Sequence, residues 1–194
     1  MQNNRAKDYF VTITLIVINV VVFLLETIAG GSENTQVALA FGALYTPYVI
    51  ENHAFWRLFT AMFLHFGIQH LASNMISLAA VGSFSERYYG HVKYLILYLV
   101  SGLCGNLFSL AVHMMQNDPS LSAGASGAIC GILGSYIIMA LDPKLRRVFP
   151  LPRVLFGIAL AILPGLTQSG VDGYAHLGGL VSGVILASFL RRRE

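Results

Sequence analysis

The sequence predicts an all-α membrane protein: a bundle of six transmembrane helices with both chain termini in the cytoplasm. Composition supports this class, since 56% of the 194 residues are hydrophobic, only 11% are charged, and the mean hydropathy is +0.68. Soluble domains are about 45–50% apolar and about 25% charged. Six apolar stretches separated by turn residues, with basic residues confined to alternate connections, predict the number of helices and their orientation.

The whole chain, residues 1–194, is predicted to form one membrane domain. Breaks rich in Gly, Asn, Asp and Pro separate its apolar stretches, as turns require. Helices are expected over residues 10–29, 62–84, 92–112, 126–141, 153–168 and 175–190. The first stretch exceeds the roughly 7–15 apolar residues of a signal peptide, so we expect a retained helix. The fifth is the least regular, because Pro164 and Gly165 interrupt it.

Lys and Arg residues predict the orientation of these helices. Eleven of the twelve lie at the termini or in the connections after the second and fourth helices: Arg5, Lys7, Arg87, Lys93, Lys144, Arg146, Arg147, Arg153, Arg191, Arg192 and Arg193. Cytoplasmic loops are enriched in Lys and Arg, so only Arg57 is expected on the outer side. The net charge of +3 thus follows from membrane topology, and no nucleic-acid partner is expected.

Ser126 and His176 are the candidate catalytic residues. Both lie where a predicted helix enters the membrane from the outer side. Ionisable residues inside membrane segments are functional by default, and an adjacent base activates a serine nucleophile. At about 1.5 Å per residue the fourth helix is about 24 Å long, shorter than a hydrocarbon core of about 30 Å. We therefore expect Ser126 to lie below the outer surface, in a recess that admits water.

His70 and Asn74 are four residues apart and share one face of the second helix. Both can donate hydrogen bonds, so with the backbone N–H of Ser126 they are candidates for an oxyanion hole. Hydrogen bonding between helices is the alternative role for the pair, with equal weight.

Two pairs of glycines predict close helix packing. Gly127 and Gly131 are four residues apart in the fourth helix, and Gly179 and Gly183 in the sixth. Such pairs let helix backbones approach, although they also occur in ordinary membrane packing. If these two faces meet, the candidate serine and histidine come within hydrogen-bond reach.

The residues around His176 favour a catalytic dyad over a triad. Asp172 is the nearest acid, but it falls in a Gly-rich loop and is expected to be solvated. A metal site made of His65, His70 and His176 is disfavoured, because His65 and His70 are five residues apart and no carboxylate or Cys accompanies them. No metal or cofactor is expected.

Five short motifs occur in a fixed order along the chain. They are Trp56-Arg57, His70-x-x-x-Asn74, Glu86-Arg87-x-x-Gly90, Gly124-Ala125-Ser126-Gly127 and Ala175-His176-x-x-Gly179-x-x-x-Gly183. Each motif alone is weak. The ordered set, together with six predicted helices, resembles the rhomboid family of intramembrane serine proteases over about residues 10–190.

The resemblance implies hydrolysis of peptide bonds in or next to transmembrane segments of membrane-protein substrates, without a cofactor or metal. It implies that Ser126 is the nucleophile and His176 the general base. It also implies that His70, Asn74 and the Ser126 N–H stabilise the oxyanion.

The resemblance also implies structural roles and a location. Trp56 and Arg57 are expected in a structured first outer loop, and Glu86 and Arg87 are expected to anchor the cytoplasmic end. Six helices are typical of the minimal bacterial form, which implies the plasma membrane with the active site toward its outer side. The first outer loop, the fifth helix and the cap loop at 169–174 are the candidate gating elements.

One position departs from the family pattern. Four residues after the nucleophile the family usually has Phe or Tyr, whose ring packs on the catalytic histidine, whereas this chain has Cys130. Tyr174 is one candidate to replace that ring. Both Cys130 and Cys104 lie in apolar segments, and their spacing is not that of a zinc site.

Two alternatives to a protease are open. A catalytically inactive rhomboid-like protein would bind membrane proteins in quality control, but such relatives usually lack the serine or the histidine. A small transporter is a weaker alternative, because the central spans carry no charged residue and no inverted repeat is evident.

Overall fold

The apolar stretches form the helices of an all-α bundle, so the predicted fold class is confirmed. The computed structural model describes residues 8–168 and 170–190. Its long helices are α1 (Phe10–Ile28), α5 (Gly67–Ser77), α6 (Ser83–Tyr89), α7 (His91–Gln116), α8 (Ser126–Ala140), α9 (Leu151–Thr167) and α10 (Gly173–Leu190). Within the described residues, α1, α7 and α10 are long and apolar enough to cross a membrane, and α8 and α9 are shorter apolar helices.

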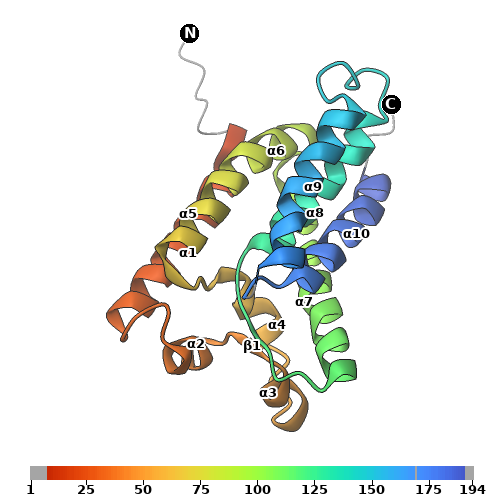
Figure 1. Cartoon of the computed structure of the whole chain (residues 1–194). Helices are drawn as coiled ribbons and strands as arrows, with labels where there is room; N and C mark the ends of the chain where they lie inside the picture. Colours follow the sequence, from red (N-terminus) through yellow and green to blue (C-terminus); the bar gives the residue numbers. More distant parts are fainter. Residues whose placement is uncertain (1–7, 169, 191–194) are drawn as a thin grey trace.

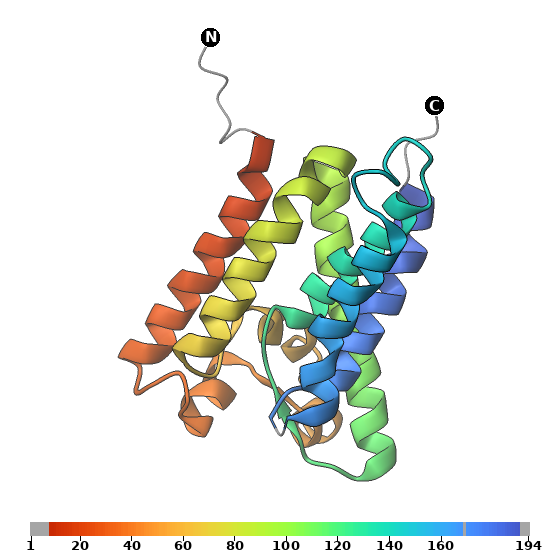
Figure 2. The ribbon, with the colours of Figure 1, turned by 45° about the horizontal axis from the view of Figure 1, so that its top comes forward.

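Successive long helices alternate in direction along the bundle. A π-helical segment, Leu78–Gly82, joins α5 and α6 into one continuous rod. The start of α1 and the end of α10 lie at the same end of the bundle (Figures 1 and 2). Helix α8 begins part way along the bundle rather than at its end (Figure 2). The number of membrane spans and their sidedness stay predictions.

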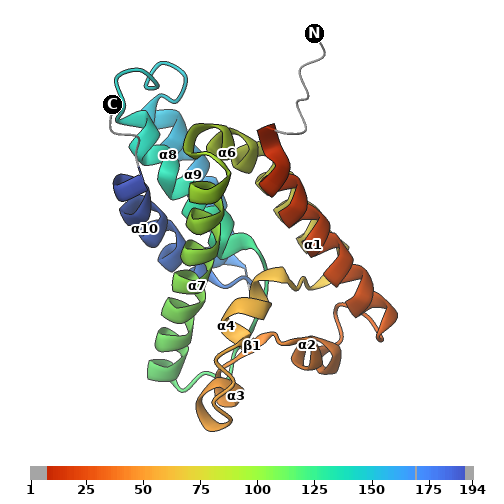
Figure 3. The ribbon, with the colours of Figure 1, turned by 180° about the vertical axis from the view of Figure 1, so that it is seen from behind.

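The connection between α1 and α5 is itself structured. It contains α2 (Thr35–Phe41), β1 (Leu44–Tyr45), α3 (Thr46–Glu51), α4 (Arg57–Thr60) and a 3₁₀ turn, Ala61–Phe63. Figure 3 shows these elements gathered between the lower parts of α1 and α7. Strand β1 pairs antiparallel with β2 (Leu121–Ser122), with Leu44 opposite Ser122. This pairing joins the first connection to the segment that precedes α8.

The second helix begins at Gly67, five residues later than predicted, and the rod extends to Tyr89. Met62 and Leu64 are apolar and almost fully buried, but they lie in the 3₁₀ turn and in extended backbone ahead of the helix. Gly67 has a φ of +80°, which ends the irregular segment. The apolar stretch therefore begins before the helix does, which made the predicted start too early. The fifth helix is more regular than predicted, because α9 continues through Pro164 without a break.

Two of the described basic residues, Arg87 and Lys93, lie at the end of the bundle where α1 begins and α10 ends. Arg87 donates to the hydroxyl of Tyr9 at 3.5 Å, and Lys93 donates to the carbonyl of Leu190 at 3.2 Å. Arg57 lies in α4, at the opposite end. Arg5, Lys7, residue 169 of the cap loop and the C-terminal arginines at 191–193 lie outside the described residues.

The faces of α8 and α10 meet backbone to backbone along their glycines. A Cβ on Gly179 would lie 2.0 Å from the carbonyl oxygen of Gly127, and a Cβ on Gly183 would lie 2.0 Å from that of Gly131. No side chain fits at either distance, so only glycine permits this approach. We call this contact, made by Gly127, Gly131, Gly179 and Gly183, the glycine seam.

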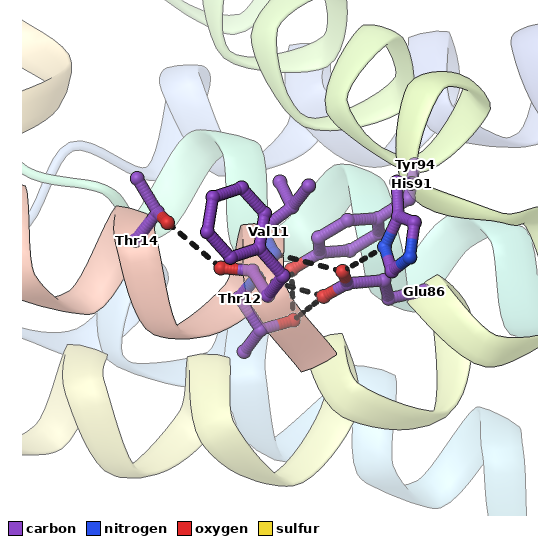
Figure 4. A network of polar contacts seen from close by, with 7 residues as sticks. Val11, Thr12, Thr14, Glu86, His91 and Tyr94 are labelled. Carbon is purple, nitrogen blue, oxygen red and sulfur yellow. Dashed lines mark hydrogen bonds and ion pairs between the residues drawn. The ribbon is translucent and has the colours of Figure 1, made fainter. Parts of the chain in front are cut away.

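Glu86 fastens the start of α1 to the rest of the bundle (Figure 4). Its carboxylate accepts the N–H of Val11 at 2.8 Å, and both the N–H and the hydroxyl of Thr12 at 2.7 Å. His91 Nδ1 lies 2.5 Å from the same carboxylate. The first N–H groups of a helix lack intrahelical partners, and a carboxylate there also meets the positive end of the helix dipole. The buried carboxylate thus accepts the hydrogen bonds that the first N–H groups of α1 would otherwise donate to water.

Gly183→Ala is expected to lower the free energy of unfolding by about 1–3 kcal/mol, because the new methyl group displaces the backbone of α8. Gly157→Ala in α9 is the matched control, since a Cβ there meets nothing within 4 Å. It should leave stability unchanged or raise it by up to about 1 kcal/mol. Unfolding in mixed micelles measures both. Equal stability of the two variants would contradict the seam.

Thr12→Val is expected to cost about 1.5–3 kcal/mol, because it removes a buried hydrogen bond to a carboxylate and keeps the side-chain shape. Thr14→Val is the control, since the exposed Thr14 hydroxyl bonds only to the carbonyl of Phe10 in its own helix. It should stay within about 0.5 kcal/mol of the wild type. The same unfolding titration compares them, and a cost at position 14 as large as at position 12 would refute the role of Glu86.

Candidate active site

The four candidate residues line one cavity of about 850 Å³. His70 and Asn74 come from α5, Ser126 from the start of α8 and His176 from the start of α10. The wall also includes polar side chains of α5 and of the loop before α8, and apolar side chains of α9: Gln69, Ser73, Ser77, Ser120, Ser122, Leu160, Ala161 and Pro164. A mixed polar wall of this kind can hold water beside an apolar bundle.

The glycine seam carries Ser126 and His176 to this cavity. Gly127 follows the serine and Ala175 precedes the histidine, and a Cβ on Gly127 would lie 3.2 Å from the carbonyl oxygen of Ala175. Ser126 is half-buried and His176 is buried. Among the described residues, no hydrogen bond joins their side chains, and in unliganded enzymes such bonds are often long.

Ser126 is the first residue of α8. The helix has no side-chain cap at Ala125, so its first N–H groups lack an intrahelical partner. The positive end of the helix dipole lies at the same place. The start of α8 can therefore stabilise negative charge that develops beside Ser126.

The imidazole of His70 lies over the loop that leads into Ser126. A Cβ on Gly124 would lie 2.9 Å from His70 Nε2 and 3.7 Å from Ser126 Oγ. Gly124 also has a φ of +135°, so both space and conformation require glycine. Asn74 is buried and donates one N–H to the carbonyl of His70 at 3.0 Å. A second N–H remains on the amide.

His65 lies behind this group rather than in the cavity wall. It is fully buried, and its ring packs edge-on against His70 with centroids 5.0 Å apart. Over residues 8–168 and 170–190, no group of three or more His, Cys, Asp or Glu side chains is arranged to hold a metal ion.

The carboxylate of Asp172 is half-buried and hydrogen-bonded within the protein, whereas its Gly-rich loop predicted a solvated side chain. Oδ2 accepts the hydroxyls of Ser109 and Ser122 at 2.6 Å each, and Oδ1 accepts the N–H of Ala175 at 2.9 Å. The carboxylate thus accepts a hydrogen bond from a free backbone N–H at the start of α10 and from two hydroxyls that are distant in the sequence. Its partners are 63 and 50 residues away in the sequence, so local composition gave no sign of them.

Among the described residues, no carboxylate is hydrogen-bonded to the ring of His176. Its Nδ1 is buried without a hydrogen-bond partner among the described residues. The neighbouring surface is Gly165 of α9, where a Cβ would lie 3.4 Å from Nδ1. The dyad of Ser126 and His176 stays a prediction.

Cys130 is buried one turn below Ser126 and lines the cavity. The ring of Tyr174 does not take the place of the missing aromatic. It packs edge-on against His113, 5.6 Å between centroids, and its hydroxyl accepts from Gln116 at 3.0 Å. Tyr174 is thereby held on the side of α7.

Arg57 organises the first connection. The buried guanidinium donates from Nη1 to the carbonyls of Leu39 and Ala43, at 2.9 Å each. It also lies 4.9 Å from the ring centre of Tyr48 and 4.7 Å from that of Trp56. These contacts hold α2, β1, α3 and α4 together, away from the cavity.

Comparison with known proteins agrees with the motifs. The rhomboid domain family matches residues 52–193. The chain is 37% identical over 182 residues to rhomboid protease GluP of Bacillus subtilis (strain 168), covering 92% of this chain and 34% of GluP. It is 30% identical over 185 residues to rhomboid-like protease 3 of Toxoplasma gondii, covering 91% of this chain and 67% of that protein. It is 37% identical over 148 residues to RHOMBOID-like protein 1 of Arabidopsis thaliana, covering 75% of this chain and 37% of that protein.

The chain spans about a third of the length of GluP and of RHOMBOID-like protein 1. The family match covers most of the chain and includes all four residues that line the cavity from α5, α8 and α10. The apolar helices make it an integral membrane protein. On this match, and on its similarity to the named proteases, the chain belongs to the rhomboid family.

Proposed function

We propose that this chain is a serine endopeptidase that hydrolyses peptide bonds in or next to transmembrane segments of membrane proteins. The observation that carries the proposal is that Ser126, His176, His70 and Asn74 line a single cavity within an apolar bundle. The names of two relatives, rhomboid protease GluP and rhomboid-like protease 3, support the same class of enzyme.

The reaction begins when Ser126 Oγ attacks the scissile carbonyl carbon and His176 takes the hydroxyl proton. A tetrahedral intermediate forms, with negative charge on the former carbonyl oxygen. His176 then gives its proton to the leaving amine, which leaves an ester on Ser126. Water from the cavity attacks that ester with His176 again as general base, and the carboxylic acid product leaves with Ser126 regenerated.

The oxyanion of both tetrahedral intermediates needs donors that are already in place. The N–H of Ser126 at the start of α8, the His70 ring above Gly124 and the second N–H of Asn74 are the donors available at the cavity. Removing one such donor from an oxyanion hole costs about 10²–10³ in kcat. The apolar surroundings strengthen each donor relative to water.

The bilayer setting follows from the charge distribution. We propose six spans, cytoplasmic termini and an active site toward the outer side of a bacterial plasma membrane. Eleven of the twelve Lys and Arg residues support that sidedness. Substrates are then other membrane proteins that reach the cavity through the bilayer.

Replacing either dyad residue should abolish cleavage. We expect Ser126→Ala and His176→Ala to lose at least about 10³-fold of the wild-type rate, because nucleophile and base act as a unit. The measurement is cleavage of a single-span reporter by purified protein in liposomes. Ser188→Ala and His53→Ala are matched controls, since both residues are exposed and outside the cavity.

The outcome separates the alternatives. Cleavage that persists in both dyad variants would show that the assignment is wrong. A wild type that neither cleaves several reporters nor reacts with a serine-directed phosphonate would favour a rhomboid-like binding protein. Labelling of Ser126 by the phosphonate would exclude the binding-only and transporter alternatives.

Cys130→Phe should be tolerated or should raise activity. The ring would lie one turn from Ser126, where the family usually places an aromatic beside the catalytic histidine, and Tyr174 packs elsewhere. Reporter cleavage by this variant is compared with Cys130→Ala, which leaves the cavity open. Loss of all activity in the Phe variant alone would show that Cys130 packs in a manner that excludes a ring.

A further inference from the structure

The carboxylate of Asp172 joins three elements that are distant in the sequence. It accepts hydrogen bonds from Ser109 of α7, from Ser122 of β2 and from the backbone N–H of Ala175 at the start of α10. Hydroxyl–carboxylate bonds of 2.6 Å are of the short, charge-assisted kind. Among the described residues, the hydrogen bonds of this carboxylate all go to the scaffold of the cavity, and none goes to the imidazole of His176.

The position of this carboxylate in the chain is informative. Ser122 precedes the candidate nucleophile Ser126 by four residues, and Asp172 precedes the candidate base His176 by four residues. One hydrogen bond therefore joins the entry segments of both helices that carry the dyad. We call the Ser122–Asp172 bond the brace.

The closest contacts of the glycine seam lie below the starts of these helices. Its pairs lie at Gly127 with Gly179 and at Gly131 with Gly183, which run away from the cavity. Helix ends fray unless their free N–H groups are satisfied. The brace acts just beyond the seam, where Asp172 also caps α10 through Ala175 and β2 is held by β1.

We propose that Asp172 is a positioning residue for the hydrolysis, and that the brace sets the separation of Ser126 Oγ and the His176 ring. This inference rests on the proposed protease function. Asp172 lines the cavity, but its hydrogen bonds go to Ser109, Ser122 and the N–H of Ala175, and we expect it to act through these contacts. Its loss should therefore slow the chemical step and leave substrate binding nearly unchanged.

The test measures kcat and KM for a single-span reporter in liposomes, with the full chain. We expect Asp172→Ala to lower kcat by about 10–100-fold, since small misplacements of reacting groups have effects of that size, and to leave KM within about two-fold. Asp172→Asn should recover most of kcat, because an amide also caps helices and can donate to the two hydroxyls. Asp118→Ala is the control: in the loop between α7 and β2, Asp118 accepts the Ser120 hydroxyl and lies 4.0 Å from His113 Nε2, and its replacement should change kcat less than two-fold.

Ser122→Ala provides a second variant that removes a single hydroxyl and spares the cap on α10. It should lower kcat in the wild-type background and add nothing to Asp172→Ala, because two residues that form one contact are not additive. Thermal unfolding and phosphonate labelling of Ser126 on the same samples show that each variant is folded and keeps its nucleophile.

The outcomes are distinct. Wild-type kcat in both Asp172→Ala and Ser122→Ala, beside an active wild type, would overturn the positioning role and leave the protease intact. A fall in kcat for Asp118→Ala equal to that for Asp172→Ala would also overturn it, since the loss of either loop carboxylate would then have the same effect on the rate. An inert wild type that fails to react with the phosphonate would overturn the protease function itself, and the positioning role with it.

Discussion

The contact of α8 with α10 is the constraint on which the rest of the structure depends. Because the two helices touch through backbone atoms at the glycine seam, their separation is set by peptide geometry rather than by side chains. Ser126 and His176 lie at the same end of this contact, so the seam brings the starts of their two helices to one cavity. The other elements either close the cavity around that end or hold the seam in the bundle.

The surrounding polar contacts share one principle, which is to satisfy backbone groups where water is scarce. Glu86 accepts the first N–H groups of α1, Arg57 donates to carbonyls of the first connection, and Asn106 of α7 donates to the carbonyl of Leu58 at 2.8 Å. Each replaces a solvent partner with a buried side chain. These buried charged and polar side chains therefore stabilise helix ends and loops.

Much of the candidate site was predictable because its determinants are local. The spacing of His70 and Asn74 puts them on one helix face, and the glycine pairs identify the faces that meet. The start of α5 was not predictable, because apolar loop residues such as Met62 and Leu64 are buried like helix residues. Contacts that join residues far apart in the sequence were also missed. Asp172 is one example, because its hydroxyl partners lie on α7 and in the segment before α8. Tyr174 is another, because its ring packs against α7.

The seam also divides the cavity wall into a fixed part and an adjustable part. The wall contributed by α8 and α10 tolerates little change, since a methyl group at the seam collides with backbone. The wall contributed by α9 consists of ordinary side chains such as Leu160 and Ala161, and the close backbone contact of α9 is at Gly165, with Gly173 at the start of α10. Engineering of cleavage preference should therefore begin in α9, where side-chain size can be altered while the spacing of nucleophile and base is inherited unchanged.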